Sequence, residues 1–267
     1  MRKDYIAATE PADHETEFVE KYWTTVWERE GGPQGHIDRI PSKDEYRAMA
    51  PYIAKLPQNA RILDGGCGLG DWTLFFARRG FSVVGLDLSR QTVEQLRTRF
   101  PEAGFVDGDI RQTNFPDSSF DAYFSWGVFE HFESGLQECV REAFRILKPG
   151  GQLFVSVPLD NLRHALLGSF ASISRNEGLQ RFYQWRLTRA ELARELAIGG
   201  FEVIETRPIH KRQGVLRGLH HEFGLPYEWF LTKALSVLLA SLIPASFVAH
   251  MVLAVARKPM EGEAYVG

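Results

Sequence analysis

Short apolar runs alternate with helix-like segments through the middle of the chain. The strand-like runs are residues 60–66, 81–87, 104–110, 120–126 and 151–158, and the helix-like segments are residues 71–80, 90–100 and 135–148. Strands that alternate with helices imply a parallel sheet covered on both faces. Right-handed crossovers then bring the carboxyl ends of these strands to one edge, where open α/β sheets bind their ligands.

Local signals mark where several helices begin and end. Ser89 is a suitable N-cap for the helix over residues 90–100, which stops before Pro101, and Gly80 is expected to end the helix before it. Thr188 and Glu191 have the spacing of a capping box at the start of a later helix.

The alternation becomes less regular after residue 158. Residues 160–185 are expected to be helical but irregular, and residues 200–208 and 249–259 to form two further strands on either side of a long insertion. We therefore expect an N-terminal helical extension or lid over residues 1–58, one α/β domain over residues 59–258 with insertions at about 159–187 and 209–245, and a tail over residues 259–267.

Composition and charge narrow the class of protein. The chain of 267 residues has 44% hydrophobic and 24% charged side chains, which is typical of one large globular domain. Its net charge of -3 gives no reason to expect nucleic acid as a partner. The polar, acidic first residues predict no secretion signal. With Cys67 and Cys139 as its only cysteines, the chain is expected to lack a disulfide scaffold and to be cytoplasmic.

Three glycines, Gly66, Gly68 and Gly70, occupy every second position after the first strand-like run. Such a cluster indicates a backbone that bends sharply or that a ligand approaches closely. A dinucleotide site has the pattern G-x-G-x-x-G, but here Asp71 stands where the third glycine is needed. Because a carboxylate at a helix start repels a pyrophosphate, the loop favours a ligand without phosphate, such as one with an ammonium and a sulfonium. A tight turn that binds no ligand is the alternative.

Acidic residues also follow the next two strands. Asp87 ends the second strand, where its carboxylate can accept both hydroxyl groups of a ribose. Asp109 follows the third strand and can accept a hydrogen bond from an adenine amino group, with Ile110 against the ring. Either carboxylate alone is equally well explained as a capping or solvated group. Together with Asp64 and the glycines, they line successive strand ends along one edge.

Five motifs in this order resemble those of the class I S-adenosylmethionine-dependent methyltransferases. They are LDGGCGLG at 63–70, GLDLS at 85–89, GDI at 108–110, FDAYFSWGVFEH at 120–131 and RILKPGG at 145–151. The likeness is best over residues 59–158 and is closest to the small-molecule (type 11) group that includes quinone-biosynthesis methyltransferases. It implies a Rossmann-like α/β fold: a seven-stranded, mostly parallel sheet with an antiparallel last strand, helices on both faces, N-terminal helices and a C-terminal helical insertion.

The resemblance also implies S-adenosylmethionine as the cofactor and assigns residues to its parts. It places Asp64, Gly66, Cys67, Gly68 and Gly70 at the loop and methionine end, Asp87 at the ribose, Leu88, Asp109 and Ile110 at the adenine, and Ser125 and Trp126 near the reacting sulfur. Arg47 falls where some relatives keep an arginine for the cofactor carboxylate.

His131 is the candidate general base of the core, because it follows the fourth strand of the domain and a neutral imidazole can accept a phenol or hydroxyl proton. The alternative is a histidine at a helix start that bonds to backbone, helped by Glu130. Tyr22, Trp23 and Trp27 lie close to one face of an expected N-terminal helix. They would either cover the pocket, where aromatic rings attract a sulfonium, or simply pack that helix on the domain.

The segment 225–243 is strongly hydrophobic but too short to span a bilayer. A basic stretch with Lys211, Arg212 and Arg217 precedes it. Burial in the core or as a lid, a homodimer contact, and peripheral association with an anionic membrane are all open. The adjacent His220, His221 and Glu222 are not spaced as metal ligands, so no metal site is expected.

The sequence thus predicts a methyltransferase that moves a methyl group from S-adenosylmethionine to an oxygen or nitrogen atom of a small-molecule acceptor. Two other classes remain: a nucleotide-linked oxidoreductase, which Asp71 disfavours, and a non-catalytic protein that binds S-adenosylmethionine. No motif identifies the acceptor.

Overall fold

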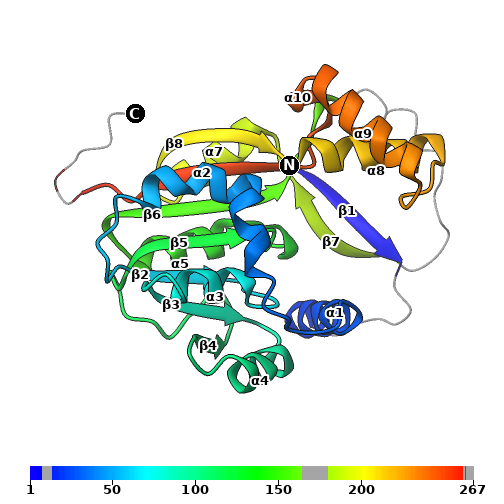
Figure 1. The fold of residues 1–267 in the computed structure, drawn as a ribbon. Helices are drawn as coiled ribbons and strands as arrows, with labels where there is room; N and C mark the ends of the chain where they lie inside the picture. Colours follow the sequence, from blue (N-terminus) through cyan, green and yellow to red (C-terminus); the bar gives the residue numbers. More distant parts are fainter. Residues whose placement is uncertain (8–13, 164–179, 261, 263–267) are drawn as a thin grey trace.

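A seven-stranded sheet forms the centre of the computed structural model, which describes residues 1–7, 14–163, 180–260 and 262 (Figure 1). Its strands are β2 (Arg61–Gly65), β3 (Ser82–Asp87), β4 (Gly104–Asp107), β5 (Phe120–Trp126), β6 (Leu147–Pro158), β8 (Glu202–Ile209) and β9 (Met251–Arg257). They are ordered β4-β3-β2-β5-β6-β9-β8. The first five strands are parallel, whereas β9 is antiparallel to both of its neighbours. The fold class expected from the sequence is confirmed.

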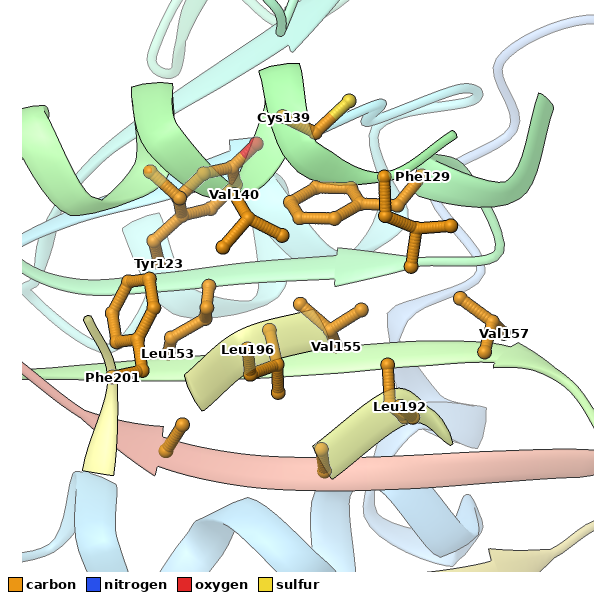
Figure 2. Packing of buried hydrophobic residues seen from close by; sticks show 14 of the residues in the cluster. Tyr123, Phe129, Cys139, Val140, Leu153, Val155, Val157, Leu192, Leu196 and Phe201 are labelled. Carbon is orange, nitrogen blue, oxygen red and sulfur yellow. The ribbon is translucent and has the colours of Figure 1, made fainter. Parts of the chain in front are cut away.

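Helices cover both faces of this sheet because neighbouring strand residues point to opposite sides. On one face, Leu153 and Val155 of β6 pack with α5 (Gln137–Ile146) and α7 (Arg189–Ile198), as Figure 2 shows. On the other face, Phe154 packs with α2 (Asp44–Ile53) and α3 (Asp71–Ala77). The apolar strand runs are thus buried from both sides, which explains their hydrophobic composition.

The local helix signals act as expected. The Ser89 side chain accepts a hydrogen bond from the Thr92 backbone N–H at the start of α4 (Arg90–Arg99). Thr188 and Glu191 form the expected capping box at the start of α7. Helix α3 ends at Ala77, slightly before Gly80, and Gly80 takes a left-handed φ in the turn that follows. These boundaries are set by neighbouring residues, which is why the sequence alone could place them.

The N-terminal extension is only partly helical. It contains α1 (Glu15–Arg29), the short helix η1 (Ile37–Ser42) and α2, as expected. Residues Arg2–Ala7, however, form strand β1, which pairs antiparallel with β7 (Gln180–Arg186). The helical expectation for residues 160–185 is therefore wrong where it reaches β7, and residues 164–179 lie outside the described part. The two strands are far apart along the chain, so no local sequence pattern predicts this pairing.

The C-terminal insertion is helical, with α8 (Lys211–Phe223), α9 (Phe230–Leu242) and α10 (Ala245–Val248). In Figure 1 these helices lie beyond one end of the sheet, next to β1 and β7. Burial of the hydrophobic segment in the core is not observed, because Thr232 and Ser236 are the buried residues of α9 and its large apolar side chains are mostly exposed. Within the described ranges, no helix has the length and apolarity needed to cross a membrane.

Candidate functional site

A cavity of about 300 Å³ lies at the carboxyl ends of β2, β3 and β5, next to helix α1. Its volume is at the lower end of the range for small-molecule sites, which begins at about 300 Å³. The sequence-predicted residues that line it are Asp64, Gly66, Cys67, Gly68, Asp87, Leu88, Asp109, Ile110, Trp126, His131, Trp23 and Trp27. The topology therefore brings together residues that lie far apart in the sequence, as the edge rule for α/β sheets requires.

The glycine loop presents bare backbone to this cavity. Gly66 and Gly68 both have positive φ, and their backbone positions leave no room for a side chain. A Cβ on Gly66 would lie 2.3 Å from a methyl group of Val128, and one on Gly68 would lie 2.8 Å from the Trp27 ring. Gly70 has another role: it precedes α3 and packs against Leu96 outside the cavity. Two of the three glycines thus form the ligand-facing surface.

Asp87 holds the glycine loop and the start of α4 together. Its carboxylate accepts hydrogen bonds from the backbone N–H of Gly68 at 2.8 Å and of Ser89 at 2.9 Å. Burial raises the pKa of Asp87, although these hydrogen bonds oppose the shift. Each carboxylate oxygen keeps a second lone pair, so Asp87 can still accept hydrogen bonds from a diol in the cavity.

Asp64 lies deeper, at the end of β2, and accepts a hydrogen bond from the Thr73 hydroxyl at 2.7 Å. Burial raises the pKa of Asp64 to about 7, and the charge of Asp87 adds to the shift. A cationic group in the cavity would favour the ionised form of both carboxylates, so their pKa values would fall when such a ligand binds.

Asp109 connects the cavity to helix α1 through Arg111. The Arg111 guanidinium donates to both carboxylate oxygens of Asp109, to the Glu15 carboxylate at 2.9 Å and to the Thr16 hydroxyl at 2.8 Å. The first turn of α1 is thereby fixed beside the adenine side of the expected site.

The remaining wall of the cavity is aromatic. Trp23 and Trp27 stack at 5.1 Å on α1, and Trp23 also contacts the His131 ring edge-on at 5.1 Å. The indole N–H groups of Trp27 and Trp126 are buried without an acceptor in the described structure. Buried N–H groups are rarely left unpaired, so these two donors indicate that an acceptor enters the cavity.

His131 lies at the edge of this wall, in the short helix η2 (Phe129–His131). Its Nδ1 is 2.8 Å from the Tyr183 carbonyl, which can only accept, so Nδ1 donates and Nε2 keeps a lone pair. Burial lowers the pKa of His131 to about 4, against the effect of the Tyr183 and Gly127 carbonyls. The ring is therefore neutral at physiological pH.

Glu130 is buried beside His131 but does not line the cavity. Burial raises the pKa of Glu130 to about 8, and its Oε2 has no hydrogen-bond partner among the described residues. Its Oε1 lies 4.0 Å from His131 Nε2. The two side chains thus form a buried pair in which each group is held in its neutral form.

Three other sequence-predicted residues lie outside the cavity. Ser125 is fully buried and donates to the Gly65 carbonyl, because its side chain points away from that of Trp126 on the same strand. Arg47 is exposed on α2 and forms a 3.8 Å ion pair with Asp44. Tyr22 contacts Tyr183 and Trp23, away from the cavity.

The sequence reasoning missed Lys43 and Glu20, which both line the cavity. Glu20 precedes Trp23 by three positions and Trp27 by seven, so helical spacing could have placed it on the same face. Lys43 precedes α2, and no local pattern marks it. Its ammonium group lies 5.6 Å from the centre of the Trp72 ring.

Comparison with known proteins identifies the family. A family model described as a methyltransferase domain matches residues 63–155. A probable S-adenosylmethionine-dependent methyltransferase of Mycolicibacterium smegmatis is 32% identical over an alignment that covers 58% of this chain and 56% of the relative. An uncharacterised methyltransferase of Synechocystis sp. is 30% identical, with 54% of this chain and 68% of the relative covered. The chain belongs to the class I S-adenosylmethionine-dependent methyltransferases.

Other relatives of this methyltransferase differ in acceptor. The 2-methyl-6-phytyl-1,4-hydroquinone methyltransferase of Synechocystis sp. is 34% identical over 47% of this chain and 42% of its own length. The chain spans about half the length of the first curated relatives that it matches. A solved Burkholderia thailandensis 1,6-didemethyltoxoflavin-N1-methyltransferase shares the fold, with a TM-score of 0.58, 15% identity and coverage of 97% of this chain and 96% of that one.

The cavity of this methyltransferase fits S-adenosylmethionine, the cofactor of its family. Two observations support the fit: Gly66 and Gly68 line the cavity with backbone alone, and two buried indole N–H groups lack acceptors among the described residues. The surrounding carboxylates of Asp64, Asp71 and Asp87 suit a ligand with positive charge.

Proposed function

We propose that this methyltransferase transfers a methyl group from S-adenosylmethionine to an oxygen or nitrogen atom of a small-molecule acceptor. The observation that carries the proposal is the cavity in which bare backbone at Gly66 and Gly68 faces acidic and aromatic side chains. When bound, S-adenosylmethionine supplies an electrophilic methyl group on a sulfonium. A nucleotide-linked oxidoreductase fits less well, because Asp71 and the other carboxylates would repel a pyrophosphate.

The residues of the cavity bind and orient the cofactor in this proposal. Asp87 accepts the ribose hydroxyls, and Asp109, Leu88 and Ile110 hold the adenine. Lys43, rather than Arg47, is placed to attract the cofactor carboxylate, since Lys43 lines the cavity and Arg47 does not. Fixing the cofactor and the acceptor in line can lower the barrier by roughly 7–11 kcal/mol.

His131 is the candidate that accepts a proton from the acceptor. It lines the cavity, and its neutral ring presents Nε2 as the basic nitrogen because Nδ1 donates to Tyr183. The Tyr183 carbonyl also favours the imidazolium that proton transfer would produce. A basic nitrogen at the wall of the cofactor cavity favours catalysis over a non-catalytic role in binding S-adenosylmethionine.

Isothermal titration of S-adenosylmethionine against Asp87→Ala tests the cofactor site. We expect the dissociation constant to rise at least tenfold, because hydrogen bonds to a charged group contribute about 1.5–3 kcal/mol. Asp107→Ala is the matched control. Asp107 lies opposite Asp87 in the register of β3 and β4, but its side chain forms an ion pair with Arg97 on the surface. Equal affinities in the wild type and Asp87→Ala, or tight binding of NADH to the wild type, would contradict the proposal.

Radiolabel transfer from the cofactor to fractionated metabolites would identify the acceptor.

We also propose that helix α9 binds the surface of an anionic membrane on the cytoplasmic side. The helix has an inverted pattern: Thr232 and Ser236 are buried, whereas Phe230 is 80% exposed and Leu242 is 71% exposed. Exposing such large apolar side chains to water is costly, so a partner is expected to cover them.

Nearby basic residues favour an anionic membrane as this partner. Lys211 and Arg212 lie at the start of the neighbouring helix α8, and basic groups beside an apolar helix are attracted to anionic lipids. Trp229 precedes α9 and is half exposed, and tryptophan is typical of the membrane interface. A lipophilic acceptor, such as the one for which the phytyl-hydroquinone relative is named, would be found there. Both cysteines are free, which fits a reducing compartment.

Co-sedimentation with anionic and neutral vesicles tests this proposal. We expect the wild type to bind anionic vesicles at low salt, and the double variant Leu238→Glu, Leu242→Glu to remain in solution. Ile198→Glu is the control, because Ile198 is similarly exposed but lies on α7. A wild type that does not bind vesicles but forms a dimer, which the double variant loses, would replace the membrane by a second copy of the chain.

A further inference from the structure

A second cavity of about 260 Å³ lies between α8, strand β7 and the start of β9. Its lining residues are mostly cationic or titratable: Asn161, Arg163, Arg186, Gly214, Arg217, His221, Glu222 and His250. Asn161 follows the carboxyl end of β6 and His250 precedes the antiparallel strand β9, so this cavity lies at the same sheet edge as the cofactor cavity.

Three guanidinium groups share this small space. Arg163 forms an ion pair with Glu222 at 2.8 Å, and Arg186 forms one with Asp4 of β1. Arg217 makes no hydrogen bond or ion pair with any residue that the structure describes, although it is only partly exposed. Among the residues that the structure describes, positive charge therefore exceeds negative charge around the cavity, even after Glu222 and Asp4 are counted.

The arginines repel one another. Burial lowers the pKa of Arg163, and the charges of Arg186 and Arg217 lower it further, against the effect of Glu222. Burial also lowers the pKa of His221, and Arg217 is the largest charge acting in the same direction. Like charges gathered around a cavity destabilise the protein unless an anion lies between them.

The backbone of α8 is shaped to hold these groups close. A Cβ on Gly218 would lie 2.5 Å from the guanidinium of Arg163, so glycine lets the arginine lie directly against the helix. Glycine inside a helix costs about 1 kcal/mol relative to alanine. An alanine at this position would therefore push the Arg163 guanidinium away from the helix.

We propose that this second cavity binds an oxyanion, either a carboxylate or a phosphate group, of the methyl acceptor. Arginine forks match the planar or tetrahedral oxygens of both groups. The inference rests on the proposed function, and it adds the class of acceptor: a molecule with one anionic end. Strand β7 links the two cavities, because its Tyr183 carbonyl accepts a hydrogen bond from His131 at the cofactor cavity and its Arg186 lines the second cavity.

Isothermal titration with inorganic phosphate and with acetate tests the proposal on the full chain. We expect one of these anions to bind the wild type, and Arg217→Gln to weaken that binding roughly tenfold, because one charge-assisted contact is lost. Binding of phosphate alone or of acetate alone identifies the anionic group. Arg212→Gln is the matched control, since Arg212 lies on the same helix but is exposed and does not line the cavity.

The proposal is overturned if neither anion binds, or if Arg217→Gln and the wild type bind both anions equally. Thermal melting of both variants shows whether the fold is retained, and Gly218→Ala provides a second test because it displaces Arg163 without changing any charge. The affinity for S-adenosylmethionine, measured on the same samples, separates the two claims. The wild type could bind the anion, with Arg217→Gln weakening that binding, and yet not bind S-adenosylmethionine. In that case the anion site is supported and the methyltransferase proposal fails.

Discussion

The Trp27 ring fills the space that a side chain at Gly68 would need, since a Cβ there would lie 2.8 Å from the indole. The same glycine donates its backbone N–H to Asp87. Helix α1, the glycine loop and the end of β3 therefore meet at one residue. This contact explains why the loop requires glycine at this position.

Gly68→Ala should weaken S-adenosylmethionine binding roughly tenfold, which corresponds to about 1.4 kcal/mol. The added methyl group pushes against Trp27, and the left-handed backbone adds a strain of about 1–2 kcal/mol. Titration calorimetry measures the first effect and chemical denaturation the second. Gly80→Ala is the control, because Gly80 also has positive φ but open space around it. It should share the loss of stability and keep the affinity; equal losses of affinity in both variants would refute a direct role of Gly68.

Lys43→Met should raise the dissociation constant for S-adenosylmethionine about tenfold, as expected for a lost hydrogen bond to a charged group. Both side chains are exposed, but Lys43 lines the cofactor cavity, whereas Arg47 lies outside it and pairs with Asp44. Arg47→Met should therefore leave the affinity close to that of the wild type. The reverse order of effects would restore the role that the sequence assigned to Arg47.

Arg111→Met should loosen helix α1 and weaken cofactor binding. Arg111 bridges Asp109 on the cavity wall to Glu15 and Thr16 in the first turn of α1. Hydrogen exchange should become faster in α1 while the central strands keep their protection. Arg97→Met is the comparison, because Arg97 joins the Phe105 carbonyl and Asp107 on β4. Unchanged exchange in α1 would show that the aromatic contacts alone hold the helix.

Glu130 should make the protein less stable as the pH rises. Its pKa is about 8 in the folded state and 4.5 for an ordinary, solvated glutamate in the unfolded chain, so the folded state binds more protons between these values. Stability then falls by about 1.4 kcal/mol for each pH unit in that window. Glu130→Gln should remove this slope, which urea denaturation at pH values of about 6 and 8, inside that window, would measure. A variant that keeps the wild-type slope would mean that Glu130 ionises normally.

His131 should have the opposite effect at lower pH. Its pKa is about 4 when folded and 6.5 for an ordinary histidine in the unfolded chain, so the unfolded state binds more protons between these values and stability rises with pH there. His131→Asn should flatten this rise. If His131 is also the base, the variant should lower kcat and leave KM nearly unchanged. A purely structural histidine would change stability alone.

The central strands and their parallel direction were predictable, because each strand depends on local signals and the direction follows from one topological rule. Apolar runs such as residues 120–126 can be buried only between two layers of helices, and the caps at Ser89 and Thr188 start their helices by bonding to nearby N–H groups. The positions of Asp87 and Asp109 at strand ends then place both beside the glycine loop.

Other site residues could not be assigned from the motif alone. Ser125 and Trp126 are neighbours in one motif, yet only Trp126 reaches the cavity, because the strand sends adjacent side chains to opposite faces. Arg47 has the expected distance along the sequence, but its side chain on α2 pairs with Asp44 outside the cavity, whereas Lys43, just before α2, lines it.

The sequence by itself determined the glycine loop, its acidic neighbours and the alternation of strands and helices, since backbone bending, capping and apolar periodicity act over a few residues. Only the tertiary structure decided that Arg2–Ala7 would pair with Gln180–Arg186, that α9 would expose its apolar side chains, and that Arg163, Arg186 and Arg217 would surround one cavity. These features join segments that are distant along the chain. Their free energy comes from packing and charge between those segments, which no local pattern records.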